Sequence, residues 1–106
     1  MKALVITPES VEVVEKDWEA KNAIHDALGG WLEALPMGPN AHAFIDEDGK
    51  FKELPYNDLA TKLCFALQIG LRPDDCIVGT MIVFGTKGSD EADVPEEVVQ
   101  LAMSLQ

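Results

Sequence analysis

Two cysteines and two histidines are the residues whose types could support nucleophilic or metal chemistry: Cys64, Cys76, His25 and His42. A cysteine nucleophile needs a histidine base in contact with it, and a structural zinc ion needs about four cysteine or histidine ligands. No pair of these residues has zinc-finger spacing, and both cysteines lie in apolar stretches typical of buried thiols. We therefore predict no catalytic residue, no metal site and no cofactor, and nothing in the spacing requires a disulfide.

Two short motifs begin like ligand-binding loops but fail on spacing. Segment 85–90, GTKGSD, lacks the spacing of a phosphate-binding loop and leads into an acidic run. Segment 46–50, DEDGK, begins like a calcium loop, but its fifth position is Lys50 and its twelfth is Asn57, where coordination needs an oxygen ligand and a glutamate. The paired carboxylates of the chain fall in predicted turns that are open to water. We do not expect the pKa of a carboxylate there to be shifted as acid–base catalysis requires.

Composition and charge restrict the partners that this chain can bind. Its 106 residues allow one domain, residues 1–106, and 8 basic against 19 acidic side chains give a net charge of −11. Nucleic-acid binding needs clustered cations, so we predict no direct nucleic-acid binding, and an anionic membrane would be repelled as well. No apolar run has the length of a signal peptide or a membrane span, and we therefore expect a cytoplasmic protein.

Short apolar and β-branched runs, bounded by proline, glycine or aspartate, are typical of strands. They predict strands at residues 3–7, 11–15, 31–35, 41–45, 51–54 and 76–84. We expect the first two strands to pair through a turn at 8–10, and the most apolar strand, 76–84, to lie at the centre of the sheet. The sequence Asp48–Gly49 suits a tight turn and predicts a hairpin between 41–45 and 51–54. Segment 85–93 is polar, and we expect a mobile loop there.

Capping residues and apolar stripes predict three helices. The first is capped by Asp17 and ended by Gly29–Gly30, the second begins after the cap Asn57 and ends at Gly70, and the third begins at Pro95. Strands and helices do not alternate regularly, which favours an α+β fold over a doubly wound one. We expect a mostly antiparallel sheet of about five to six strands, with all three helices on one face.

Two aromatic residues and one amide stand at element ends, where a partner could reach them. Trp31 follows the double glycine, Tyr56 precedes the second helix, and Asn57 is that helix's cap. Tryptophan and tyrosine are enriched at the energetic centres of protein interfaces. Trp31, Tyr56 and Asn57 are therefore the predicted partner-binding residues, although core and rim packing already accounts for the aromatics and helix capping already accounts for the amide.

Several segments together resemble a family of small proteins of unknown function that is frequent in actinobacterial phages, mobile elements and some bacteria. The segments are MKALVI at the start, LGGWLEAL after the first helix, LPYNDLATKL at the second, and CIVGTMIVFG. The resemblance covers residues 1 to about 85. It implies a small cytoplasmic protein, made inside a bacterial host and acting on a host or phage protein, and it brings no catalytic mechanism.

The functional hypotheses fall into different classes. The first is a non-enzymatic interaction protein that binds a host or phage protein. The second is a DNA-mimicking inhibitor, for which Glu9, Glu12, Glu15 and the acids of 90–97 would have to line up at about the 7 Å phosphate spacing, roughly twice the rise of an extended chain. The third is a small-ligand or enzymatic domain with a closed, polar pocket. A homodimer through a free sheet edge is compatible with each of them.

Overall fold

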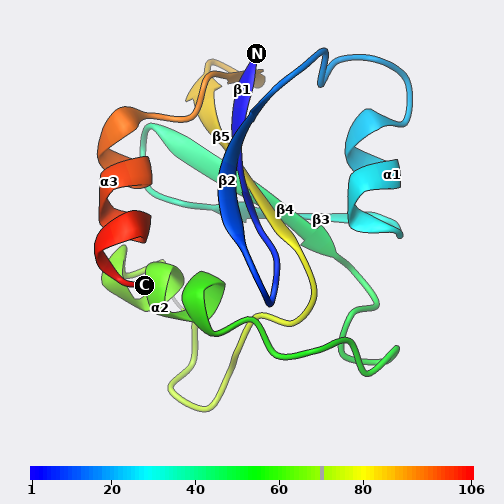
Figure 1. Cartoon of the computed structure of the whole chain (residues 1–106), viewed down its shortest axis with the longest axis vertical. Helices are drawn as coiled ribbons and strands as arrows, with labels where there is room; N and C mark the ends of the chain where they lie inside the picture. Colours follow the sequence, from blue (N-terminus) through cyan, green and yellow to red (C-terminus); the bar gives the residue numbers. More distant parts are fainter. Residues whose placement is uncertain (70) are drawn as a thin grey trace.

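The computed structural model describes residues 1–69 and 71–106. The described residues form six strands and three helices (Figure 1). In chain order these are β1 (Lys2–Ile6), β2 (Val11–Glu15), α1 (Ala23–Leu28), β3 (Leu32–Pro36), β4 (Ala41–Asp46), α2 (Asp58–Ala66), β5 (Met81–Lys87), β6 (Asp90–Ala92) and α3 (Glu96–Ser104). None of these helices is long and apolar enough to cross a membrane.

The strands form one antiparallel sheet in the order β2-β1-β5-β4-β3, and β6 pairs with residues 85–87 of β5. The predicted α+β fold is confirmed, and so is the pairing of the first two strands through the turn after Thr7. The apolar strand β5 lies at the centre, as its composition indicates, because β1 occupies one of its sides and β4 the other. The two ends of the sheet are therefore β2 and β3.

The helices cover both faces of the sheet, and the expectation of a single covered face is wrong. Alternate residues of β1 point to opposite sides: Leu4 and Ile6 join the cluster beneath α2 and α3, whereas Ala3 joins the cluster that contains Trp18 and Leu28 of the α1 side. Figure 1 shows α2 and α3 on one side of the sheet and α1 on the other. The central strands are apolar in nearly every position because each face is covered.

The first helix begins at Ala23 with Asn22 as its N-cap, and the predicted cap Asp17 lies outside the helix. Asp17 accepts a hydrogen bond from the backbone N–H of Glu19 at 3.2 Å, a local turn instead of a helix cap. Trp18 is buried, donates its indole N–H to the carbonyl of Val14 at 3.1 Å, and packs edge-on against Phe84. Trp18 therefore packs on the sheet from the segment before α1 and is not part of the apolar face of that helix. The predicted glycine stop is confirmed, since Gly29 has φ 79°.

The hairpin predicted at Asp48–Gly49 does not form. Residues 47–53 wind into consecutive turns, in which the N–H of Lys52 donates to Asp48 at 2.9 Å and the N–H of Leu54 donates to Gly49 at 3.0 Å. The physical reason is that β4 already has β3 on one side and β5 on the other, so residues 51–54 have no free edge to pair with.

The predicted strand 76–84 and loop 85–93 are shifted in the structure. Residues 76–80 contain only an isolated bridge between Tyr56 and Val78, and β5 begins at Met81. Most of the predicted loop 85–93 is strand: β5 continues to Lys87, and a two-residue turn leads directly into β6. The predicted end of the second helix at Gly70 lies outside the described residues.

Asn57 joins three parts of the fold through a fully buried side chain. Its Nδ2 donates to the carbonyls of Ile6, at 2.9 Å, and Gly79, at 2.7 Å, while its Oδ1 accepts from the N–H of Ala60 at 3.0 Å. The last contact is the predicted helix cap. The first two tie β1 and the entry to β5 to the start of α2.

We expect Asn57→Ala to destabilise the fold by about 3 kcal/mol, because it removes a helix cap and leaves two buried carbonyls without donors. Asn57→Ser should lose less, since a hydroxyl can still accept from the helix. Urea unfolding monitored by circular dichroism measures both. Asn40→Ala is the control: Asn40 is exposed, and its variant should change stability by less than about 0.5 kcal/mol. Equal stabilities of the Asn57 and Asn40 variants would contradict this role.

Candidate functional site

The β3 strand is an edge strand with free backbone groups. Two backbone hydrogen bonds, from Glu47 N–H to Trp31 O and from Met37 N–H to Ala41 O, are both 2.9 Å long. They show that the backbone N–H and C=O groups of the odd-numbered β3 residues point toward β4. Because antiparallel strands alternate, the N–H and C=O groups of Leu32 and Ala34 point away from the sheet. Pro36 follows the same alternation, and its missing N–H costs no ladder hydrogen bond. The β3 edge thus offers donors and acceptors to another strand.

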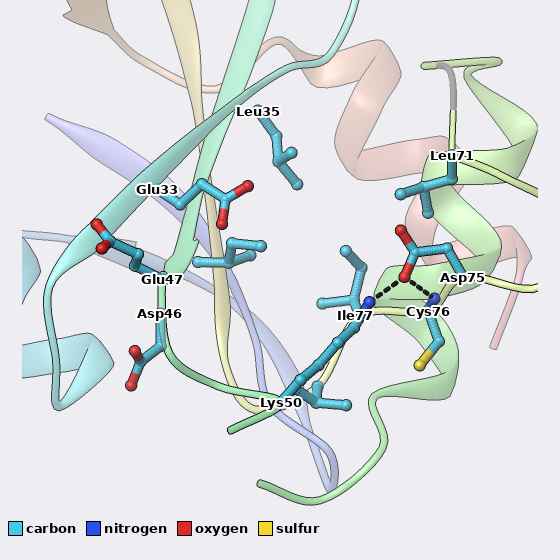
Figure 2. A pocket seen from close by; sticks show the side chains of 11 residues that line it. Glu33, Leu35, Asp46, Glu47, Lys50, Leu71, Asp75, Cys76 and Ile77 are labelled. Carbon is cyan, nitrogen blue, oxygen red and sulfur yellow. Dashed lines mark hydrogen bonds and ion pairs between the residues drawn. The ribbon is translucent and has the colours of Figure 1, made fainter. Parts of the chain in front are cut away.

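A groove of about 180 Å³ adjoins the β3 edge on the side of α2. We call it the acidic groove (Figure 2). Its apolar walls come from β3, β4 and the segment that precedes β5, namely Leu35, Ile45, Leu71 and Ile77, and its charged lining includes Glu33, Lys50 and Asp75. Figure 2 shows the Glu33 carboxylate on the β3 wall and Asp75 on the opposite wall.

An ion pair between Lys50 and Asp75 crosses part of the acidic groove (Figure 2). The hydrogen bond between them raises the pKa of Lys50 and lowers the pKa of Asp75, which also accepts the N–H of Cys76 at 2.8 Å. Both side chains remain partly exposed, so the pair contributes little stability. Glu33 and Glu47, which both line the groove, have no ion-pair partner among the described residues, and the charge of the groove is therefore net negative.

The turn that carries Lys50 is held by a second ion pair, on the other side of β4. The buried carboxylate of Asp46 accepts from Lys52 Nζ at 2.7 Å and from the N–H of Asp48 at 2.8 Å. The hydrogen bond from Lys52 is the main reason that the pKa of Asp46 lies below its usual value. Gly30 permits this pair, because a Cβ there would clash with Asp46 Oδ2. The second glycine of the pair therefore makes room for the Asp46–Lys52 ion pair that holds residues 47–52.

The opposite face of the β3 edge carries a shallower hollow of about 440 Å³, which we call the aromatic shelf. Ala34 and Pro36 pair in register with Phe44 and His42 of β4, and all four line the shelf. Its surface is mainly apolar, with hydrogen-bonding groups at the β5–β6 end. The two hollows thus lie on the two sides of one edge strand.

His42 is a residue with reactive chemistry that the structure brings next to polar groups distant in the chain. Its Nδ1 lies 2.7 Å from Thr86 Oγ1, and its Nε2 lies 3.4 Å from Glu91 Oε1. Hydroxyl, imidazole and carboxylate thus follow in the order used by hydrolases. Thr86, however, is on a regular strand with its N–H bonded to Asn40 O, and Glu91 is its cross-strand partner. The register of β4, β5 and β6 therefore accounts for the cluster.

The cysteines are separated from this histidine by the sheet. Cys64 is fully buried in the cluster beneath α2 and α3, and burial raises its pKa to about 12. His42 instead pairs with Phe84, which belongs to the opposite cluster. Cys76 is half-buried, and both cysteines are free. In residues 1–69 and 71–106, no three His, Cys, Asp or Glu side chains group as metal ligands.

The three residues predicted to bind a partner occupy different environments. Trp31 is 70% exposed at the start of the β3 edge, with its ring 5.0 Å from that of His25. Tyr56 is also exposed, but it lies on the segment before α2 and forms no aromatic pair with Trp31 in the described part of the chain. Asn57 is a correction: it is fully buried and makes the structural contacts described above, so it presents no surface to a partner.

The carboxylates required for DNA mimicry do not form one row. Glu12 pairs with Val5, whereas Glu15 pairs with Lys2, and residues an odd number apart on a strand point to opposite faces. In β6, the adjacent side chains of Asp90 and Glu91 likewise point to opposite faces of the sheet. This arrangement does not support a phosphate-like row of charges along either segment.

Sequence reasoning missed the acidic groove because its charged residues are distant in the chain. Lys50 and Asp75 are 25 positions apart, and no local spacing relates them. One signal was present: strand 31–35 carries Glu33 between apolar residues and is followed by Pro36, and proline within a sheet is typical of an edge strand.

The chain matches the model of a known family. A family model described as "Domain of unknown function (DUF3846)" matches residues 1–105. No curated protein and no solved structure matches the chain.

We expect Asp46→Asn to reduce stability at pH 7 by about 1–2 kcal/mol, because it removes a buried, charge-assisted hydrogen bond. A carboxyl with a lowered folded-state pKa stabilises above its unfolded pKa of about 3.9, and this contribution is lost as pH falls through the lower folded value. The difference between wild type and variant should therefore shrink below about pH 4. Thermal unfolding from pH 2 to 7 measures it. Asp74→Asn, at an exposed carboxylate, is the control.

We also expect the two thiols to differ in reactivity. Iodoacetamide reacts with the thiolate, which Cys64 barely forms because of its burial, so Cys76 should be alkylated in the folded protein and Cys64 only in urea. Mass spectrometry of the alkylated peptides distinguishes the two sites. A Cys76→Ser variant should take up no label when folded. Rapid labelling of that variant would contradict the burial of Cys64.

Proposed function

Because the chain belongs to the DUF3846 family, whose function is unknown, we propose its function from its own surface: it is a non-enzymatic interaction protein that takes up an extended segment of a partner along the β3 edge. A peptide that adds a strand to a free sheet edge gains affinity from backbone hydrogen bonds and specificity from pockets for its alternate side chains. The observation that carries the proposal is the free β3 edge with a hollow on each side.

The exposed apolar side chains at the start of β3 support the same site. Trp31 is 70% exposed and Leu32 is 38% exposed, although each is large and apolar. An exposed hydrophobic edge strand is normally protected by charge, proline or a covering element, because it invites pairing with another chain. Pro36 limits the far end of β3, whereas Leu32 and Ala34 remain open. A partner segment would cover these residues.

The other sheet edge offers less to a partner. On β2 the outward groups belong to Val11, Val13 and Glu15, because Lys16 and Met1 exchange hydrogen bonds in the register of the pair. Val13 is exposed, but the hollow near this edge lies at the turn after Thr7 and not on both sides of the strand. The two edges therefore provide a matched pair for experiment.

The setting that we propose is the cytoplasm of a bacterial cell, where the partner is a host or phage protein. The resemblance of the sequence to a family frequent in phages supports this setting. The net charge of −11 supports a protein partner with a basic surface over a nucleic acid or an anionic membrane.

We expect Ala34→Pro to weaken peptide capture at least about tenfold, because proline removes an outward N–H and blocks the approach of a strand. The measurement is selection of a yeast-displayed library of random peptides on the wild-type protein, followed by titration of the selected peptides on each variant. Ala34→Val keeps the N–H and adds apolar surface to the cross-strand contact, so it should bind at least as tightly as wild type. Val13→Pro makes the equivalent change on the β2 edge and should also bind as wild type.

Two results would contradict the proposal. One is a selection that yields no binder to the folded wild-type protein. The other is a set of binders that bind Ala34→Pro as tightly as Ala34→Val. Loss of binding with Val13→Pro alone would place the docking edge at β2 and reject β3. Circular dichroism of each variant confirms that it is folded before titration.

A further inference from the structure

We infer that the partner segment carries basic side chains at alternate positions, facing the acidic groove, and apolar side chains at the positions between them, facing the aromatic shelf. This inference rests on the proposed function, because it uses the β3 edge as the docking strand. Side chains of a paired strand point alternately to the two faces of a sheet. Every second residue of the partner would therefore meet the groove, and the others would meet the shelf.

The acidic groove fits a long side chain with a cationic end. Its walls next to the sheet are apolar, and Leu35 and Ile45 pack against the main core cluster. The Glu33 carboxylate projects from the β3 wall, and Asp75 faces it from the other wall (Figure 2). Lysine and arginine place an aliphatic stem on apolar surface while the charge stays near solvent. An acidic side chain in the same position would meet Glu33 without a compensating charge.

Lys50 acts in this site as an internal competitor for the incoming cation. Its ammonium group is bonded to Asp75 and neutralises that carboxylate, while Glu33 remains without an ion-pair partner in the described chain. The charge of Glu33 also favours the protonated form of Lys50. Removal of the Lys50 charge should therefore strengthen the binding of a basic segment, whereas removal of the Glu33 charge should weaken it.

The aromatic shelf fits the positions between the basic residues. Ala34, Pro36 and Phe44 present apolar surface beside the outward backbone groups of β3. A β-branched or aromatic side chain of the partner would lie directly opposite Ala34 on this face, where cross-strand pairs stabilise a sheet. The two faces of β3 thus select opposite side-chain types.

Charge complementarity favours a basic partner over a second copy of this chain. Two copies paired through their β3 edges would bring two acidic grooves together, and each copy has a net charge of −11. Like charges that face each other across a strand pair are destabilising. A basic segment instead neutralises the groove.

The test uses synthetic peptides of about seven residues, the length of an ordinary strand. The probe alternates lysine and valine. One comparison peptide has the same composition, but its lysines and valines are in separate blocks, and another replaces lysine by glutamate. Fluorescence titration on the wild-type protein should show at least tenfold tighter binding of the alternating peptide than of the block peptide, and no binding of the glutamate peptide.

Protein variants separate the groove from the general charge of the molecule. With the alternating peptide, Glu33→Gln should weaken binding about tenfold, and Lys50→Gln should strengthen it severalfold. Glu9→Gln and Lys62→Gln make the same charge changes at exposed positions away from the groove, and they should change binding by less than about twofold.

The outcomes distinguish this inference from the proposed function. If library peptides bind in a manner sensitive to Ala34→Pro, but the alternating peptide binds no better than the block peptide, the inference is wrong while the β3 edge stands. Equal effects of Glu33→Gln and Glu9→Gln would show attraction by net charge only and also overturn it. If light scattering shows a dimer that Ala34→Pro dissociates, a second copy occupies the edge and both proposals fail.

Discussion

The buried amide of Asn57 fixes the geometry on which the rest of the molecule depends. It is the first turn's cap for α2, and through Ile6 and Gly79 it also joins that helix to β1 and to the residues before β5. Thr61, one turn later, accepts the N–H of Ile77 and donates to the carbonyl of Asn57, both at 2.8 Å. Because buried polar groups are costly without partners, this network allows little displacement of residues 75–79.

The wall of the acidic groove is a consequence of that network. Asp75 and Ile77 lie on the segment that Asn57 and Thr61 hold, and Glu33 and Leu35 lie on the far edge of the sheet. The groove exists because the sheet ends at β3, where no further strand or helix of the described residues fills the space beside α2. The same ending leaves the backbone groups of Leu32 and Ala34 free. An edge strand and a hollow next to it therefore have one structural origin.

Local signals predicted those elements whose residues interact along the chain. The hairpin of β1 and β2, the glycine stop of α1, the Asn57 cap and the start of α3 after Pro95 depend on neighbours within a few residues. The predicted hairpin at Asp48–Gly49 was wrong because β3 and β5 already occupy both sides of β4. The turn-forming residues are used in the consecutive turns of residues 47–53 instead. Trp18 likewise fits a helical stripe by spacing, but it packs against Phe84, which is distant in the sequence.

By itself, the sequence determined the fold class, the central position of the apolar strand β5 and the net charge of −11. These features follow from composition and from local periodicity. Only the tertiary structure decided that Asn57 is buried, that α1 covers the face opposite α2 and α3, and that Glu33, Lys50 and Asp75 line one groove. The physical reason is that strand order and sheet edges depend on which strands pair with one another across the whole chain. The residue spacing within one segment does not determine that pairing.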